Sequence, residues 1–348
     1  MTLLQPFIRS ISVFVILGAS CACQGRAAPP TSDDVEVLVS AFEEAHHDRD
    51  WARAIEVGLR LDEVRPNDQT VRFNLACVYA LHGDHDKAVD WLTMAAKNGL
   101  HRVALIEKES DLDSVRDHPG YAAALERVKS NYERRRTRTR TKFERQPPPI
   151  YLPPRYDETR AAPLIIALHG LGGWGSDIAD AWRDAAGDVG AILVAPEATR
   201  RLKGSRGFNW IDSDDAGYIV ELTLDYAKKK HQIDPDRVIL TGFSQGGFMA
   251  YAIATQHPDW FTGVIPMGTG YLPSIDAPPP VPEGPHPRYY FMVGASDPAA
   301  PQTKQAAEDF ATAGYTVELE VYPSAGHVFP LNPRQGLRRA LTFVLSKS

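Results

Sequence analysis

The sequence predicts two domains: a small all-α domain, then an α/β domain with a mostly parallel sheet and helices on both faces. Residues 34–130 show only helix-type patterns, whereas from residue 150 onward apolar β-type runs alternate with helix-type segments. That alternation is typical of parallel strands joined by helices. The chain has 348 residues, which exceeds one average domain and agrees with two.

The composition is that of an ordinary globular protein, with 43% apolar and 24% charged residues. A net charge of −6 gives no reason to expect a nucleic-acid partner. Of the three cysteines, Cys21 and Cys23 lie in or beside an N-terminal signal, and Cys77 would be alone after processing. We therefore expect no structural disulfide. No cysteine or histidine cluster has metal-ligand spacing, so we expect no metal and no cofactor.

Residues 1–23 have the pattern of an export signal. Arg9 precedes an apolar run over 11–17, and small residues follow up to Cys21. The run is too short to span a bilayer. The small residues before Cys21 also resemble a bacterial lipoprotein signal, which would leave Cys21 as the lipidated first residue; ordinary cleaved export is the alternative. We expect an exported protein, in the bacterial periplasm or cell envelope or secreted, with membrane contact only through such an anchor.

Residues 34–130 carry a 34-residue spacing that places 50–55 and 84–89 at equivalent positions. The pattern resembles the tetratricopeptide repeat, although Phe42 stands where that repeat has a small residue. Two interpretations stay open: a groove for a protein partner, or a small helical module that packs on its neighbour. The second repeat is the clearer one, with its signature residues at Ala76, Tyr79, Gly83, Ala88, Leu92 and Ala95.

Residues 131–149 are a basic run that ends in three prolines. Such a composition predicts a solvated linker between the two domains. Contact with anionic lipid or polymer is the alternative interpretation.

In the α/β domain, residues 150–348, apolar runs predict strands and intervening segments predict helices. The expected strands cover 163–168, 191–195, 238–240, 264–267, 289–293 and 317–322, and the expected helices cover 176–186, 216–230, a segment that ends at His257, and 336–346. A Pro-rich loop over about 273–287 is expected as an insertion at the carboxyl edge of the sheet.

The residues between the strand at 238–240 and an Ala-rich helix are Gly242-Phe-Ser244-Gln-Gly246. This strand–turn–helix context is that of a nucleophile elbow, in which a tight turn lifts a serine hydroxyl above the strand end. Small residues are needed two positions before and after the serine because a Cβ there would clash. We expect Ser244 to be a catalytic nucleophile, with the backbone N–H of Gln245 facing the attacked oxygen.

A nucleophilic serine needs a base and an orienting acid, which in this arrangement follow it along the chain, each just after a strand. His327 follows the strand at 317–322, whereas His257 lies at a helix end and His286 between prolines. Asp297 follows the strand at 289–293. The competing acids lie in a helix-end turn, the Pro-rich loop and a helix: Asp259, Asp276 and Asp309. The sequence predicts His327 as base and Asp297 as orienting acid.

The segment His169-Gly170-Leu171 ends the strand at 163–168. We expect the backbone N–H of Leu171 to form an oxyanion hole together with that of Gln245. His169 is expected to be a structural histidine.

Three large apolar residues near these motifs are candidates for the substrate pocket. Trp174, Trp210 and Phe243 would favour an apolar or aromatic acyl group, and a place in the core is the alternative for each.

The glycines of this loop also match a dinucleotide-binding fingerprint. Gly170, Gly172 and Gly175 have its spacing, and Glu197 lies near the position of the ribose-binding acid. The helix is expected to begin with a cap at Ser176, so that the glycines do not open it. The fingerprint also does not account for the predicted catalytic triad of Ser244, Asp297 and His327. A lone match is weak, and we do not expect a dinucleotide.

Together, the motifs around His169, Ser244, Asp297 and His327 resemble those of serine hydrolases of the α/β-hydrolase fold. They are most similar to small carboxylesterases and phospholipases and to polyhydroxybutyrate-depolymerase-like and feruloyl-esterase-like enzymes. The resemblance covers about residues 150–348 and implies ester hydrolysis through an acyl-enzyme, on a small-molecule or polymer ester. A peptidase of the same fold and a repeat-containing protein that only binds remain as alternatives.

Overall fold

A computed structural model describes residues 32–202, 207–271, 277–329 and 333–346. The predicted export signal over 1–23, with Cys21, lies outside these residues. The chain divides into two compact units, Met1–Arg138 and Thr139–Ser348. No helix in the described ranges combines the length and the apolar character needed to cross a membrane.

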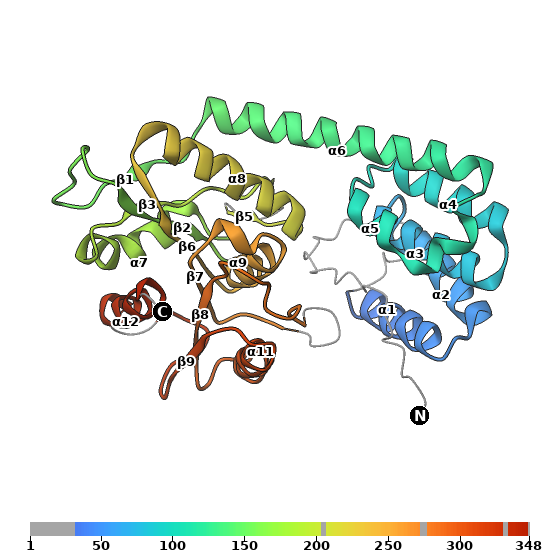
Figure 1. The fold of residues 1–348 in the computed structure, drawn as a ribbon. Helices are drawn as coiled ribbons and strands as arrows, with labels where there is room; N and C mark the ends of the chain where they lie inside the picture. The colour runs from blue at the N-terminus through green and yellow to red at the C-terminus, as the bar shows by residue number, and fades with distance from the viewer. Residues whose placement is uncertain (1–31, 203–206, 272–276, 330–332, 347–348) are drawn as a thin grey trace, which may run out of the picture. The chain divides into compact units, whose positions relative to one another are not determined.

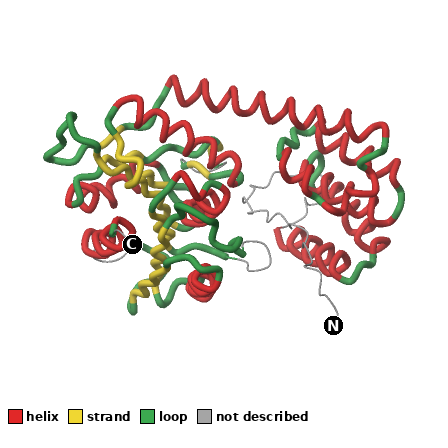
Figure 2. The backbone as a smooth tube through the Cα atoms, in the orientation of Figure 1, coloured by secondary structure: helices red, strands yellow, loops and turns green. Residues whose placement is uncertain are grey.

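The first unit is all-α, as the sequence predicted (Figures 1 and 2). Consecutive helices pack against one another, α1 on α2, α2 on α3 and α3 on α4. Its elements are α1 (Ser32–His47), α2 (Trp51–Val64), α3 (Gln69–His82), α4 (His85–Lys97), α5 (Val103–Lys108), a 3₁₀ turn (Ser110–Val115) and the first part of α6 (Pro119–Arg145). Whether this module is a tetratricopeptide-type repeat stays a prediction.

The 34-residue spacing corresponds to two helices that begin in the same way. Asp50 caps α2 by accepting the N–H of Arg53, and Asp84 caps α4 by accepting that of Lys87. A capping carboxylate satisfies one of the free N–H groups of the first turn. One turn further on, Ala54 and Ala88 are both fully buried. The spacing therefore reflects equivalent caps and equivalent core positions.

The bulky residue of the first repeat is accommodated by a glycine on the next helix. Phe42 of α1 is buried, and a Cβ on Gly58 of α2 would lie 3.1 Å from the Phe42 ring and 2.7 Å from Leu75. Since core packing leaves little free volume, the missing side chain at Gly58 makes room for the large one at Phe42.

The expected linker requires a correction, because residues 131–145 continue helix α6. Arg, Lys and Glu are good helix formers, and the hydroxyl of Thr137 bonds back to the carbonyl of Glu133 within the helix. The prolines begin only at Pro147, after the helix ends. The residues of α6 from Thr139 onward belong to the second unit, within which Phe143 lies edge-to-face against Tyr226 at 5.9 Å.

The second unit contains a seven-stranded sheet in the order β1-β3-β2-β6-β7-β8-β9. All neighbouring strands are parallel except β1, which pairs antiparallel with β3. The strands are β1 (Ile150–Tyr151), β2 (Ala162–Leu168), β3 (Ile192–Val194), β6 (Ile233–Phe243), β7 (Gly263–Met267), β8 (Arg288–Gly294) and β9 (Val317–Tyr322). A short hairpin of β4 (Arg200–Arg201) and β5 (Phe208–Asn209) stands apart from it.

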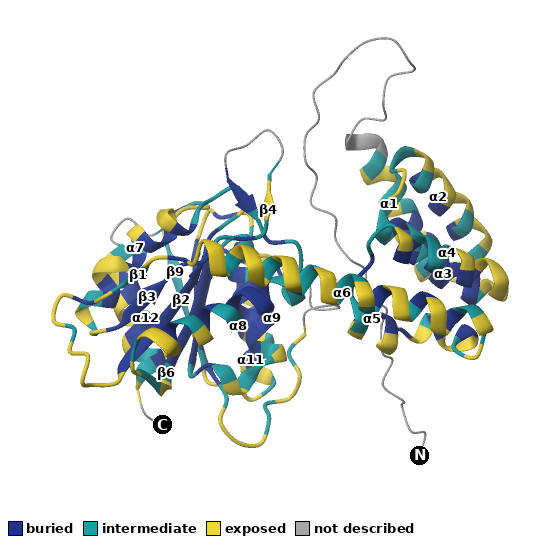
Figure 3. Cartoon of the chain, turned by 90° about the horizontal axis from the view of Figure 1, so that it is seen from above, coloured by how far each residue is buried: buried dark blue, intermediate teal, exposed yellow. Residues whose placement is uncertain are grey.

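Helices cover both faces of this sheet, and its central strands are buried (Figure 3). On one face lie α7 (Gly175–Asp188) and α12 (Pro333–Leu345), whose apolar residues share a core with Ile165, Ile239 and Ile265. On the other face lie α8 (Ser213–Lys230), α9 (Gln245–Gln256) and α11 (Ala300–Thr312). The strand order, the parallel pairing and the two helical layers confirm the predicted α/β-hydrolase fold.

Phe310 of α11 is fully buried among aromatic rings on the second face, with Tyr289 at 4.5 Å and Phe291 at 5.7 Å. We expect Phe310→Ala to lower the free energy of unfolding by about 3–5 kcal/mol, because it leaves a cavity in a close-packed core. Denaturant unfolding measures the change. Leu152→Ala, at a side chain that is 47% exposed, is the control, with an expected effect below about 0.5 kcal/mol. Equal effects would contradict this placement of the core.

Candidate active site

Ser244 lies in the sharp turn between β6 and α9, and its backbone is strained. Its φ of 55° and ψ of −119° are unusual for a residue with a Cβ. The turn closes only around glycines: a Cβ on Gly242 would be 2.1 Å from the carbonyl oxygen of Gly246. A Cβ on Gly246 would be 2.2 Å from that of Leu168. The residues of the predicted elbow thus form the turn that lifts the serine side chain above the sheet.

His327 lies beside this serine, in the loop after β9. Its Nε2 is 2.9 Å from Ser244 Oγ, and its Nδ1 is 2.8 Å from Asp297 Oδ2. Because an ionised carboxylate only accepts hydrogen bonds, Nδ1 carries a hydrogen and donates a hydrogen bond to Asp297 Oδ2. Nε2 is then free to accept the proton of the serine hydroxyl, which is the arrangement that activates a serine as a nucleophile.

Asp297 is held by the loop after β8 and is only 4% exposed. Its second oxygen, Oδ1, accepts the backbone N–H of Ala299 at 2.8 Å. The loops that carry the acid and the base are joined by backbone hydrogen bonds, from Ala295 N to Tyr322 O at 2.8 Å and from Ser296 N to Ala325 O at 2.9 Å. The structure therefore brings the three residues selected from the sequence to one edge of the sheet, with backbone ties between two of their loops.

The remaining histidine and acid candidates lie elsewhere. His257 ends α9 and stacks on Trp260, with ring centroids 3.9 Å apart. His286 bonds to the carbonyl of Gly284, and Asp309 to the hydroxyl of Tyr271. Asp259 belongs to a short 3₁₀ turn, and Asp276 lies outside the described residues.

The two predicted oxyanion donors come from different segments. Gln245 is the first residue of α9, so its N–H has no acceptor within the helix. In the described ranges the N–H of Leu171 has no backbone acceptor either. A Cβ on Gly170 would lie 3.4 Å from the Cβ of Ser244, so this loop passes directly beside the serine. The helix N-terminus adds positive potential where an oxyanion would form.

His169 has a structural role at the start of that loop. It is 1% exposed, its Nε2 accepts the backbone N–H of Ala198 at 3.2 Å, and its Nδ1 lies 2.8 Å from the carbonyl of Gly170. Burial lowers the pKa of this imidazole, which favours the neutral form that accepts at one nitrogen and donates at the other.

The candidate pocket residues do not share one cavity. Trp210 is 2% exposed, and its indole N–H donates to the carbonyl of His169 at 2.8 Å. Trp174 packs edge-to-face on Phe208 at 5.2 Å. Phe243 packs against the imidazole of His327 at 4.9 Å. Trp210 therefore has almost no surface for a ligand, and of the three only Phe243 lies directly against the candidate triad.

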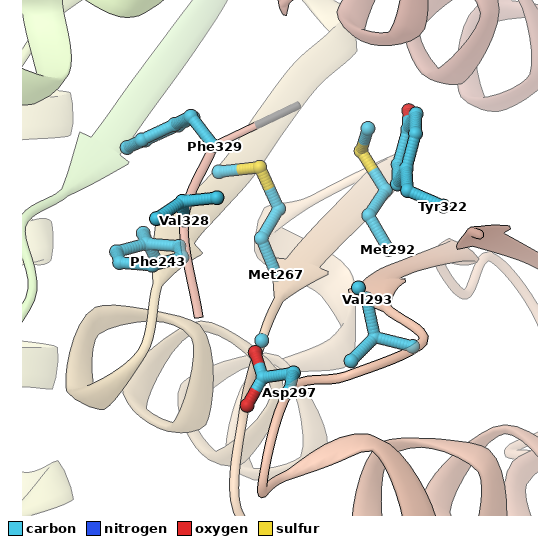
Figure 4. A pocket seen from close by; sticks show the side chains of 10 residues that line it. Phe243, Met267, Met292, Val293, Asp297, Tyr322, Val328 and Phe329 are labelled. Carbon is cyan, nitrogen blue, oxygen red and sulfur yellow. The ribbon is translucent and has the colours of Figure 1, made fainter. Parts of the chain in front are cut away.

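A small, mostly apolar cavity lies beside Asp297, lined on other sides by Phe243 and Val328 (Figure 4). Gly268, with φ +53°, lies at its wall: a Cβ there would be 2.9 Å from Asp297 Oδ2. The sequence analysis did not identify Gly268. Its position directly after β7 could have indicated it, because Asp297 likewise lies in the loop after a neighbouring parallel strand, β8. The lining residues are Phe243, Met267, Gly268, Met292, Val293, Gly294, Asp297, Tyr322, Val328 and Phe329.

The dinucleotide interpretation finds no support in the glycine loop. The expected start at Ser176 was wrong, because helix α7 begins at Gly175 and the last glycine of the fingerprint does open it. Asp177 accepts the N–H of Trp174 at this end of the helix. The N–H of Gly175 is taken by Glu197 Oε1 at 2.9 Å. A phosphate at this helix N-terminus would meet a carboxylate, so Glu197 acts here as a cap for α7.

The sequence also resembles known hydrolases. Residues 197–340, which contain Ser244, Asp297 and His327, match the Dienelactone hydrolase family. The chain is 31% identical over 116 residues to Poly(3-hydroxyalkanoate) depolymerase C of Paucimonas lemoignei, covering 31% of this chain and 28% of that protein. It is 31% identical over 134 residues to Feruloyl esterase B of Thermothelomyces thermophilus (35% and 44% covered). The chain therefore spans less than half the length of either relative.

Among solved structures, that of esterase PE8 covers 57% of this chain and 96% of its own, with a TM-score of 0.47 and 22% identity.

Gly268→Ala should disturb the Asp297–His327 contact, because the new Cβ would collide with the carboxylate. We expect labelling of Ser244 by a fluorophosphonate to slow roughly 10- to 100-fold, since small displacements of catalytic groups have effects of this size. Gly284→Ala is the matched control: its φ of +104° is equally unfavourable for alanine, but nothing lies within 4 Å. Equal labelling rates for the two variants would contradict the role of Gly268.

The buried His169 should also make stability depend on pH. Unfolded, it ionises with the ordinary pKa of 6.5, and burial lowers the pKa in the folded protein. The unfolded chain therefore binds more protons just below that pH, and acidification through this window lowers the free energy of unfolding. His169→Gln should reduce this dependence, measured by unfolding at several pH values. Burial also lowers the pKa of His257, so this residue should account for part of the pH dependence that remains in His169→Gln. An unchanged pH dependence in His169→Gln would contradict this.

Proposed function

We propose that this chain, whose second unit has the α/β-hydrolase fold, is an exported serine esterase that cleaves carboxylic esters through an acyl-enzyme. One observation carries the proposal: the hydrogen-bonded series from Ser244 Oγ through His327 to the buried carboxylate of Asp297, at 2.9 and 2.8 Å. The relatives named as a polyhydroxyalkanoate depolymerase and a feruloyl esterase support ester rather than other acyl substrates.

In the first half of the reaction, Ser244 Oγ attacks the ester carbonyl carbon while His327 Nε2 takes the hydroxyl proton. The negative charge that develops on the carbonyl oxygen is stabilised by the N–H groups of Leu171 and Gln245. His327 then gives its proton to the departing alcohol oxygen, which leaves the acyl group on Ser244. Asp297 stabilises the transient imidazolium and keeps the ring oriented.

In the second half, His327 Nε2 takes a proton from water, whose oxygen attacks the acyl carbonyl carbon. The same two N–H groups hold the second oxyanion. When the tetrahedral species collapses, Ser244 Oγ leaves and recovers its proton from His327, and the free acid is released.

The surroundings of Ser244 favour an apolar ester that is bound on an open surface. The side chain of His327 is 41% exposed. Leu171 is 42% exposed and Val328 57%, each next to a candidate active-site residue. A ligand that covers such apolar side chains removes their surface from water, which favours binding. We propose that they contact the acyl or alcohol group of a small or polymeric ester, with Phe243, which packs on His327 at 4.9 Å, beside them.

Export rests on the pattern of residues 1–23. N-terminal analysis of the mature protein decides between a lipidated Cys21 and ordinary cleavage.

The proposal of a protein partner for the helical unit rests only on the repeat-like spacing. If the intact chain retains no partner from its own host, that part of the proposal is wrong.

The triad assignment predicts the effect of three substitutions on hydrolysis of 4-nitrophenyl acetate. Ser244→Ala and His327→Gln should each lower kcat by roughly 10⁵- to 10⁶-fold, and Asp297→Asn by roughly 10⁴-fold, because the three groups act as one unit. Ser213→Ala, on α8, is the control, and its kcat should equal that of the unaltered protein. Hydrolysis by Ser244→Ala at the rate of the unaltered protein would overturn the proposal.

Two rival functions give different results in the same assay. A peptidase would also cleave a 4-nitroanilide of the same acyl group, whereas an esterase would leave this amide intact. A protein that only binds would hydrolyse neither, and Ser244 would not react with a fluorophosphonate.

A further inference from the structure

The side chain of Gln245 connects the elbow to a distant segment of the chain. Its Oε1 accepts the backbone N–H of Trp210 at 3.1 Å, and its Nε2 donates to the carbonyl of the same residue at 3.0 Å. One amide thus satisfies both main-chain groups of Trp210, as a neighbouring strand would. The residue that supplies one predicted oxyanion donor through its backbone therefore holds Trp210 through its side chain.

Trp210 in turn contacts the loop that supplies the other donor. Its indole N–H donates to the carbonyl of His169 at 2.8 Å, and its ring lies 5.0 Å from the imidazole of His169 at an angle of 32°. His169 opens the loop that carries Leu171. Since Trp210 is 2% exposed, water competes little for this hydrogen bond.

The same segment also holds the loop on the far side of Leu171. Gly172 N donates to Phe208 O at 2.8 Å, and Phe208 N donates to Gly173 O at 3.1 Å. The approach is close, because a Cβ on Gly207 would lie 1.8 Å from the carbonyl oxygen of Gly172. Residues 208–210 therefore form hydrogen bonds with this loop both before Leu171, at His169, and after it, at Gly172 and Gly173.

We infer that the Gln245 side chain and Trp210 are positioning residues that fix the distance between the two oxyanion donors. We call the path from Gln245 through Trp210 to His169 the donor bridge. The inference rests on the proposed function, and it adds a role for two side chains that take no part in the proton transfers.

The physical reason lies in the origin of the two N–H groups. One follows β2 and the other follows β6, so the elbow alone does not fix their separation. Oxyanion donors are effective when both lie about 2.7–3.1 Å from the developing charge. The two N–H groups stabilise the oxyanion of the tetrahedral species more than the neutral carbonyl of the bound ester. Loss of a hydrogen bond in the donor bridge should therefore lower kcat more than it changes KM.

The test replaces Gln245 by methionine, which has similar length and helix propensity but cannot make either hydrogen bond. We expect kcat for ester hydrolysis to fall roughly 10- to 100-fold, less than the roughly 10²- to 10³-fold for loss of a whole donor. KM should stay within about 2-fold, since uniform binding is not changed. The matched control is Gln256→Met on the same helix, whose amide donates to Ser213 Oγ at 3.2 Å, away from the elbow.

A second measurement separates positioning from general destabilisation. A trifluoromethyl ketone adds reversibly to Ser244 and places an oxyanion in the hole. Its affinity for Gln245→Met should fall by the same factor as kcat/KM, because both report on transition-state binding. A variant that is merely less stable would bind this inhibitor normally below its unfolding temperature.

A double-mutant cycle tests whether the two side chains act together. Trp210→Phe removes the indole N–H and keeps an aromatic ring, with Trp260→Phe as its control. If both residues belong to one bridge, the double variant should lose less activity than the product of the single losses.

Full kcat and full inhibitor affinity in Gln245→Met, or independent losses in the cycle, would overturn the donor bridge and leave the esterase proposal intact. Absence of hydrolysis in the unaltered protein would instead refute the proposed function.

Discussion

The strained backbone of Ser244 is the constraint on which the rest of the site depends. A φ of 55° at a residue with a Cβ costs of the order of 1–3 kcal/mol and persists only where the surroundings impose it. Here the N–H of Ser244 is held by the carbonyl of Met267 at 2.8 Å, and glycines on both sides allow the main chain to close. This turn brings the serine hydroxyl to within 2.9 Å of His327 Nε2 and, at the next residue, begins helix α9.

The parallel sheet supplies the other groups at the same edge. Parallel strands all end on one side, so the loops after β2, β8 and β9 meet near the elbow. Their relative positions are then set by main-chain contacts: a Cβ on Gly294 would lie 2.3 Å from the carbonyl oxygen of Ala325. The Ser244–His327–Asp297 geometry is thus a consequence of how tightly backbones approach one another, and the side chains add only the last hydrogen bonds.

Several polar groups with functional-looking patterns are structural supports. The glycine loop after β2 could serve a phosphate or an oxyanion, and local sequence does not distinguish the two. The difference is made by Glu197, 22 residues further on, which occupies the N–H of Gly175. His169 and Trp210 likewise direct their polar atoms at main-chain partners. In each case, the polar atoms of the side chain form hydrogen bonds with main-chain groups and thereby stabilise the loop.

The sequence alone determined the α/β alternation, the elbow and the chain order of Ser244, Asp297 and His327, because these patterns depend on local periodicity and on conformations of a few adjacent residues. It did not show that α6 continues through the basic run, that Gly58 makes room for Phe42, that Gly268 borders Asp297, or that the Trp210 indole donates to the carbonyl of His169. Those features depend on contacts between residues far apart in the chain, such as the 41 positions that separate Trp210 from His169. Only the packing of the folded chain decides such contacts, since a residue's own neighbours do not reveal which distant surface it will meet.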